Sequence, residues 1–281
     1  MRVANNSRPS HQPLSDLDSV RSIFNEVAET IDLVPIRNPI NSWMRNVSRR
    51  AILETFPPGS NLFEIGCGSG ADAVHLAEHG FRVAALDISD LMVKLTNERT
   101  VAHNCAARVV AVRGRITDLV EDLMRLAWFP FDGAYANFSL AYEDSLRKVM
   151  EAAYLLLKPG AWFVFSLPNK LCVSHVVSAL SRLHVSNAFN RLREPYWTEM
   201  RGQPIRVRLY TPGGMSRIVK GLFEVRAYVG VPVFMPPSSL YDPTFEGLRR
   251  SLEHLDNRLS DRFPWRLLGE STLFKAQRVA E

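Results

Sequence analysis

Apolar runs and helical patterns alternate in the central part of the chain. Residues 62–65 form a short apolar run that predicts a buried strand, and residues 71–79 show helical spacing that ends at Gly80. Glycine suits the left-handed position that closes many helices. A second apolar run, 81–86, follows and ends on Asp87. A helical segment between two apolar runs predicts a strand–helix–strand unit with parallel strands.

The alternation continues along the rest of the chain. We expect further strands at 108–112, 131–138, 161–167, 223–231 and 272–277. We expect further helices at 15–31, 40–56, 90–104, 145–157, 212–220 and 244–259. Pro35 and Pro39 are expected to break the helical pattern between the first two of these helices. Strands that alternate with helices indicate an α/β fold.

Five segments are expected from this pattern. They are a disordered tail at 1–14, a helical lid at 15–60, an α/β core at 61–168, an inserted cap at 169–210, and the remainder of the core at 211–281, which carries a helical insertion at about 232–270. The cap is longer than a simple connection between two elements. It contains one clear strand pattern, in which Ile205, Val207 and Leu209 alternate with polar residues.

A glycine-rich turn lies between the first strand and its helix. Gly66, Gly68 and Gly70 leave room for a ligand to approach backbone N–H groups at a helix N-terminus. Asp87, about 20 residues further on, has the place of an acid that accepts both hydroxyls of a ribose. The spacing also matches the dinucleotide fingerprint, but Glu64 disfavours it because dinucleotide-binding strands usually carry a small or aliphatic residue there. A carboxylate at that place suits a ligand with an ammonium group.

The segments 64–70, EIGCGSG, and 86–89, LDIS, resemble the first two motifs of class I S-adenosylmethionine (SAM) methyltransferases, and LKPGAWFVF at 157–165 is a further similarity. The resemblance implies a seven-stranded Rossmann-like sheet whose last strand is antiparallel, with a cap formed by insertions. It implies SAM as cofactor and S-adenosylhomocysteine as product. The reaction would be methyl transfer of the EC 2.1.1 type.

The resemblance also implies a set of cofactor-binding residues. They are Glu64, Gly66, Cys67, Gly68, Gly70, Asp87, Ile88, Met92, Ile116 and Asn137. Many relatives have an acid directly after the third strand, where this chain has Arg115, so we assign adenine recognition to backbone groups around Ile116. Asn137 and Phe138, at the carboxyl end of the fourth strand, and Tyr142, after it, are the candidates that position the reactants. The segment is not NPPY, which disfavours methylation of DNA bases.

Aromatic residues of the lid and cap are the candidates for acceptor binding. They are Phe24, Trp43, Tyr196, Trp197 and Tyr210, and plain packing is the alternative for Phe24 and Trp43. A weakly acidic acceptor would need a general base. The candidates are His175, His184, Glu194 and Tyr210, of which none is assigned.

One sequence pattern resembles a metal-binding motif, but its position argues against a metal site. His75, Glu78 and His79 match the H-x-x-E-H pattern of some zinc peptidases. They lie on the helix directly after the glycine turn, whose apolar face must pack on the sheet, so we expect no metal site.

Charge and composition narrow the choice of partner. The net charge is +5 and the pI about 9.3, but the arginines are scattered and no nucleic-acid-binding motif accompanies them. Three widely spaced cysteines suit a reducing compartment, and no apolar run reaches the roughly 18 residues that cross a bilayer. We therefore expect a cytoplasmic methyltransferase that acts on a small molecule, with secondary metabolism as its setting and without a membrane partner. A catalytically silent SAM-binding or scaffold protein and an RNA methyltransferase remain alternatives, and the acceptor and the oligomeric state stay open.

Overall fold

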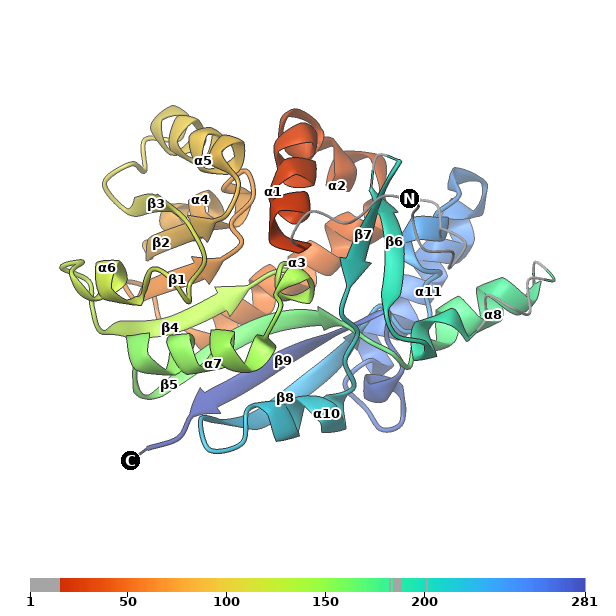
Figure 1. The fold of residues 1–281 in the computed structure, drawn as a ribbon. Coiled ribbons are helices and arrows are strands. Elements are labelled where there is room, and N and C mark those ends of the chain that lie inside the picture. Colours follow the sequence, from red (N-terminus) through yellow and green to blue (C-terminus); the bar gives the residue numbers. More distant parts are fainter. Residues whose placement is uncertain (1–15, 182, 184–188, 201, 281) are drawn as a thin grey trace.

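The computed structural model describes residues 16–280 except 182, 184–188 and 201. The expected tail at 1–14 and the candidate base His184 lie outside these residues. A seven-stranded sheet forms the centre of the molecule (Figure 1). Its strands are β1 (Asn61–Ile65), β2 (Arg82–Asp87), β3 (Val109–Arg113), β4 (Phe131–Ala136), β5 (Leu157–Pro168), β8 (Phe223–Val231) and β9 (Ser271–Arg278).

The strand order is β3-β2-β1-β4-β5-β9-β8. Strands β1 to β5 pair in parallel, and β9 runs antiparallel to both of its neighbours. The predicted seven-stranded α/β sheet with an antiparallel last strand is therefore confirmed. The order reverses beside β1, because β2 lies on one side of it and β4 on the other. Ligands of open parallel sheets bind at the carboxyl ends of the strands at such a reversal.

Both faces of the sheet are covered by helices, because its strands are apolar on both sides. Leu62 and Phe63 are both fully buried, yet they belong to two separate clusters of packed side chains. Consecutive residues of a strand point to opposite faces. The helices are α1 (Asp16–Val27), α2 (Leu33–Arg37), α3 (Pro39–Thr55), α4 (Ala71–Glu78), α5 (Asp90–Ala102), α6 (Val120–Met124), α7 (Leu146–Leu156), α8 (Val173–Ser181), α10 (Pro212–Ile218) and α11 (Glu246–Leu259). Helices α3 and α4 pack around Leu62, and α7 and α10 pack around Phe63.

The N-terminal region departs from the prediction at one proline. Pro35 was expected to break the helix, but it lies inside the five-residue helix α2. It is the third residue of α2, in the first turn, where a backbone N–H has no acceptor within the helix and its loss costs little. Pro39 behaves as expected and opens α3, with Asn38 as its N-cap.

The inserted cap contains a hairpin rather than the single predicted strand. Strand β6 (Tyr196–Met200) pairs with β7 (Gln203–Val207) in an antiparallel ladder. The predicted strand continues to residue 210, but Tyr210 leaves the hairpin and bonds the end of β5, with its N–H donating to the Pro168 carbonyl at 3.0 Å. The bond to the end of β5 takes the chain away from the hairpin, and no local sequence pattern predicts this bond.

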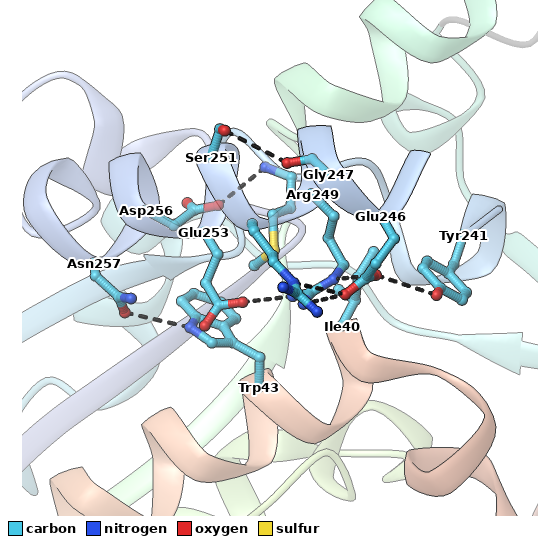
Figure 2. Close-up of polar contacts among 12 residues, drawn as sticks. Ile40, Trp43, Tyr241, Glu246, Gly247, Arg249, Ser251, Glu253, Asp256 and Asn257 are labelled. Carbon is cyan, nitrogen blue, oxygen red and sulfur yellow. Dashed lines mark hydrogen bonds and ion pairs between the residues drawn. The ribbon is translucent and has the colours of Figure 1, made fainter. Parts of the chain in front are cut away.

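The second insertion is held against α3 by α11 (Figure 2). The Trp43 indole N–H donates to the Asn257 side-chain oxygen at 3.3 Å. The fully buried carboxylate of Asp256 accepts backbone N–H groups of three successive residues, which folds the chain before α11 over that helix. These residues are Val233, Phe234 and Met235.

Candidate cofactor and acceptor site

The glycine turn connects β1 to α4 in a backbone conformation that suits glycine. Gly66 and Gly68 have φ values of +76° and +54°. A Cβ on Gly66 would lie 2.3 Å from the Cβ of Ser139, so the chain cannot accept a side chain there. A Cβ on Gly68 would meet no atom within 4 Å. Gly68 therefore borders open space beside the N-terminus of α4, where a ligand can approach backbone N–H groups.

Asp87 is held against this turn by the backbone. One carboxylate oxygen accepts the N–H of Gly68 and the other accepts the N–H of Ser89, each at 2.9 Å. Burial raises the pKa of Asp87, against the effect of these bonds. A carboxylate has about four lone-pair sites, so this side chain can accept further donors from a ligand.

Glu64 is almost fully enclosed at the end of β1. Its side chain accepts a hydrogen bond from the Tyr135 hydroxyl at 3.0 Å. Burial and the nearby charge of Asp72 raise the pKa of Glu64 well above its usual range. A buried acid of this kind favours either a proton or a cationic partner.

Glu64→Gln is expected to change how stability depends on pH. The folded state raises the pKa of Glu64 from about 4.5, so ionisation costs stability as pH rises above that value. Gln keeps an acceptor for Tyr135 but cannot ionise. The melting temperature of the variant relative to the wild type should therefore be higher at pH 8 than at pH 5. Glu98→Gln, at an exposed position on α5, is the control, and a difference that does not depend on pH would contradict the expectation.

A buried polar network adjoins the turn at Asp72, in the first turn of α4. Its carboxylate binds the Arg49 Nε at 2.6 Å and lies 3.7 Å from Arg45. The Asn137 amide donates to the other oxygen at 3.0 Å, and the Asn137 carbonyl accepts from Ser48. Burial raises the pKa of Asp72, but the two arginines outweigh it and lower that pKa. The network ties α3 and the end of β4 to the glycine turn.

The chain reverses sharply after β4. Phe138 has φ +60°, an uncommon value for a residue with a side chain, and its N–H donates to the Ser166 hydroxyl at 2.8 Å. The hydroxyl of Ser139, the residue after Phe138, donates to the Ile65 carbonyl of β1. Both bonds fix the end of β4 beside the ends of β1 and β5. Backbone strain held by neighbouring strands is typical of functional sites.

The segment before α3 contacts both cofactor motifs directly. The Ser89 hydroxyl donates to Asn25 at the end of α1, and the Ser69 hydroxyl donates to Asp32, each at 2.6 Å. Asp32 also pairs with Arg99 of α5. In Figure 1, α1 stands between the strand ends and the β6–β7 hairpin. These contacts join the segment before α3 to the glycine turn and to the residues after Asp87.

The structure brings four of the candidate residues into one apolar cluster. Ile88, Tyr142, Phe24 and Tyr196 all pack around Ala141 and side chains of α1 and β7. The rings of Phe24 and Tyr142 meet edge to face, with centroids 5.2 Å apart. Burial raises the pKa of Tyr142 to about 12, so its hydroxyl stays neutral. Helix α1, the end of β4 and the β6–β7 hairpin therefore meet in one apolar cluster, which includes Ile88, the residue after Asp87.

Other candidates lie elsewhere in the fold. Trp43 packs against α11, as Figure 2 shows, and Tyr210 packs against the core around Phe63. Trp197 lies opposite Arg206 in the hairpin. These three aromatic residues lie outside the apolar cluster that contains Phe24 and Tyr196.

The remaining cofactor candidates are packed into the core. Met92, Ile116 and Cys67 are buried, and burial raises the pKa of the Cys67 thiol well above its usual range. The thiol therefore stays protonated, in keeping with a packing role for Cys67.

The candidate bases differ in their surroundings. His175 is buried on α8, and Glu194 is exposed and pairs with Lys170. Burial raises the pKa of Tyr210. Within the described residues, no group of His, Cys, Asp and Glu side chains is arranged to hold a metal ion.

Sequence reasoning missed the residues that join separate segments. Asp72, Arg49 and Ser48 form the network behind the turn, and Asn25 and Asp32 accept hydrogen bonds from Ser89 and Ser69. One signal was available: Arg45 and Arg49 are four residues apart on a helix, so both can face one carboxylate. The choice of Asp72 as their partner depends on how α3 packs on α4.

Comparison with known proteins agrees with this geometry. A family model described as a methyltransferase domain matches residues 37–219. A SAM-dependent Diels–Alderase, iccD of Talaromyces variabilis, is 32% identical over 44% of this chain and 42% of its own length. A demethylmenaquinone methyltransferase of Symbiobacterium thermophilum is 27% identical over 56% of this chain and 62% of its own. The chain thus spans about half the length of these curated relatives.

Solved structures show the same fold at low identity. The N-methyltransferase NodS of Bradyrhizobium japonicum, crystallised with S-adenosylhomocysteine, has a TM-score of 0.54 at 15% identity and covers 93% of this chain and 98% of its own. A SAM-dependent methyltransferase of Mesorhizobium loti has a TM-score of 0.52 at 18% identity, with coverage of 82% and 96%.

Proposed function

The chain belongs to the family of methyltransferase domains, and from that premise we propose that it transfers a methyl group from SAM to a small-molecule acceptor. The observation that carries the proposal is the pairing of an open glycine turn with an acid at the end of the next strand. Gly68 faces free space, and Asp87 is fixed against the same turn by the Gly68 N–H. A nucleoside with an attached amino-acid chain needs both features side by side.

The residues of this chain fit such a cofactor. Asp87 would accept the ribose hydroxyls, and the backbone around Gly68 would approach the amino-acid end. The raised pKa of Glu64 means that this buried acid favours a cationic partner or a proton, which suits a ligand with ammonium and sulfonium groups. When bound, SAM supplies an electrophilic methyl group, so the protein's contribution is mainly to position the acceptor.

Asn137 and Phe138 are proposed to shape the place where the acceptor meets the methyl group. The Asn137 side chain donates to Asp72 and accepts from Ser48, so it fixes the end of β4, and its amide nitrogen has a second N–H for a ligand. The raised pKa of Tyr142 makes its hydroxyl a neutral hydrogen-bonding group at physiological pH. Tyr142 would thus orient the acceptor without taking its proton.

The acceptor is proposed to carry an apolar portion. Phe24, Tyr142 and Tyr196 pack in one cluster whose buried members are all apolar. A small molecule placed there would lie next to Ile88, the residue after the ribose-binding acid. A fungal relative, the O-methyltransferase resE of Aspergillus sclerotiorum, is 27% identical over 45% of this chain. Secondary metabolism is therefore the proposed setting.

Asp87→Ala is expected to weaken S-adenosylhomocysteine binding by about 1–3 kcal/mol, because two ribose hydroxyls would lose their acceptor. Isothermal calorimetry measures the effect. Asp90→Ala, three residues later at an exposed ion pair with Arg113, is the matched control and should bind as the wild type does. Equal affinity of a folded Asp87→Ala variant and the wild type would refute the ribose assignment.

Methyl transfer itself is tested with SAM labelled in its methyl group and an extract of small molecules. Label should pass into the organic-soluble fraction with wild-type protein and should be strongly reduced with Asp87→Ala. Label in an added RNA fraction would instead favour the RNA alternative suggested by the pI of about 9.3.

A second candidate function is catalysis or scaffolding that requires SAM without methyl transfer. The observation that favours it is the similarity to iccD, which is named a SAM-dependent Diels–Alderase. Tight binding of S-adenosylhomocysteine together with no labelled product from any extract would support this second candidate.

A further inference from the structure

Arg191 is a buried cation in the inserted cap. It belongs to a short helical turn, Asn190–Leu192, shortly before the hairpin, and only 8% of its surface is exposed. Its Nε–H donates to the Asn169 carbonyl and one Nη–H donates to the Glu270 carbonyl, each at 2.9 Å. The first carbonyl directly follows β5 and the second directly precedes β9, so Arg191 is held at the edge of the sheet where the parallel strands end.

The charge of Arg191 has no counter-ion in the described part of the chain. Both of its acceptors are neutral backbone carbonyls. The carboxylate of Glu270 is occupied elsewhere, because it accepts the N–H and the hydroxyl of Ser238 at 2.8 Å and 3.0 Å. A guanidinium has five N–H groups, so Arg191 keeps donors for a ligand. Arginine is rarely buried unless it is paired, and a buried guanidinium without an acid therefore indicates a place for an anion.

Arg191 borders the apolar cluster that is proposed to receive the acceptor. Its guanidinium carbon lies 5.8 Å from the centroid of the Tyr196 ring, and Tyr196 packs in that cluster together with Phe24 and Tyr142. The hairpin fixes this arrangement, because Tyr196 pairs with Val207, a buried member of the same cluster. A ligand in the cluster would thus meet the guanidinium on its Tyr196 side.

Two hydroxyl groups of the cluster, those of Tyr142 and Tyr196, have no hydrogen-bond partner among the residues that the structure describes. Burial raises the pKa of both groups, so each stays neutral and can donate a hydrogen bond. Side-chain polar groups inside a protein are normally hydrogen-bonded. The cluster therefore combines apolar walls with donors that favour an oxygen acceptor, and a carboxylate accepts several such bonds at once.

We propose that the acceptor molecule carries a carboxylate group, which pairs with Arg191 while the apolar portion of the molecule lies against Phe24 and Tyr142. The inference rests on the proposed function, because it adds a second recognition element for the same acceptor. A hydrogen bond between a guanidinium and a carboxylate is roughly twice as strong as one between neutral groups, and it is often bidentate. Arg191 thus selects acidic acceptors over neutral ones and orients them, and it takes no part in the bond changes of methyl transfer.

Titration calorimetry of the full chain saturated with S-adenosylhomocysteine tests the proposal. The probes are cinnamic acid and cinnamamide, which share an aromatic portion and differ in charge at pH 7. The acid should bind the wild type roughly tenfold or more tightly than the amide. Arg191→Gln should weaken binding of the acid roughly tenfold or more, because only the acid loses an ionic partner. Binding of the amide should stay unchanged.

Two further variants control for charge and for folding. Arg193→Gln removes an exposed arginine two residues later and should bind both probes as the wild type does. Arg191→Lys keeps the positive charge, but an ammonium group cannot bind a carboxylate through two parallel N–H bonds. It should weaken binding of the acid several-fold, and it replaces Arg191→Gln if circular dichroism shows that Arg191→Gln fails to fold.

Three results would overturn the inference. They are no binding of cinnamic acid by the wild type, equal binding of the acid and the amide, and a preference for the acid that Arg191→Gln retains in full. Failure of the proposed function has a different signature, which is the absence of S-adenosylhomocysteine binding in a titration without probes. Titration of the free protein with the two probes would still measure the preference that Arg191 confers.

Discussion

Gly68→Val is expected to lower the affinity for S-adenosylhomocysteine at least a hundredfold, or about 2.8 kcal/mol. The Cβ of residue 68 would project into space that no protein atom within 4 Å occupies. A ligand that approaches the N-terminus of α4 must use that space. The side chain would thus exclude the cofactor without disturbing a packed neighbour.

The same substitution also strains the backbone, so the two effects must be separated. Gly68 has φ +54°, and a β-branched residue in this region costs of the order of 1–3 kcal/mol. Gly221→Val is the matched control: its φ is +80°, a Cβ there also meets nothing within 4 Å, and it lies in the turn before β8. Both variants should lose similar stability by urea denaturation, and only Gly68→Val should lose binding. Normal affinity in Gly68→Val would show that the ligand does not pass over the turn.

Asp72→Ala is expected to destabilise the fold by roughly 3–5 kcal/mol, the usual result of removing one member of a buried ion pair. Its carboxylate is 5% exposed and satisfies Arg49 at 2.6 Å and Asn137 at 3.0 Å. Alanine would leave the guanidinium and the amide without their partner in the interior. The contact also joins α3 to α4, so its loss would loosen the lid as well as the turn.

Urea unfolding measures this effect, and Asp122→Ala controls for the helix position. Asp122 also lies in the first turn of its helix, α6, and pairs with Arg125 at 3.2 Å, but it is exposed. Surface pairs contribute about 0–1 kcal/mol. A loss at Asp72 no larger than the loss at Asp122 would mean that the network adds little to stability.

The cofactor motif and the core strands were predictable because their signals are local. The turn of Gly66 to Gly70 and the acid Asp87 belong to one strand–helix–strand unit, and neighbouring elements of a parallel unit must pack together. Strands such as β1 and β4 are buried on both faces, so an apolar run marks each of them. In the structure, the Gly68 N–H donates a hydrogen bond to the Asp87 carboxylate, within the strand–helix–strand unit that the sequence predicts.

The predictions for the hairpin and for the helix that contains Pro35 were wrong in detail for related reasons. Residues 196–200 show no clean alternation of polar and apolar residues, and they form strand β6 by pairing with β7. Helix α2 is five residues long and packs on α3, so tertiary contact outweighs the weak helix preference of proline. Short elements depend on their neighbours for stability.

The sequence by itself determined the α/β class, the order of elements along the chain, and the turn and acid that fit a nucleoside cofactor. Each of these depends on spacing within a few tens of residues. The tertiary structure decided which distant side chains meet: Asp72 with Arg49, Asn25 with Ser89, and Phe24 with Tyr142. It also decided which side of α8 is covered: His175 and Ala179 are buried, whereas Val177 and Leu180 are exposed. Such contacts follow from the relative placement of packed elements, for which no local pattern of residues carries a signal.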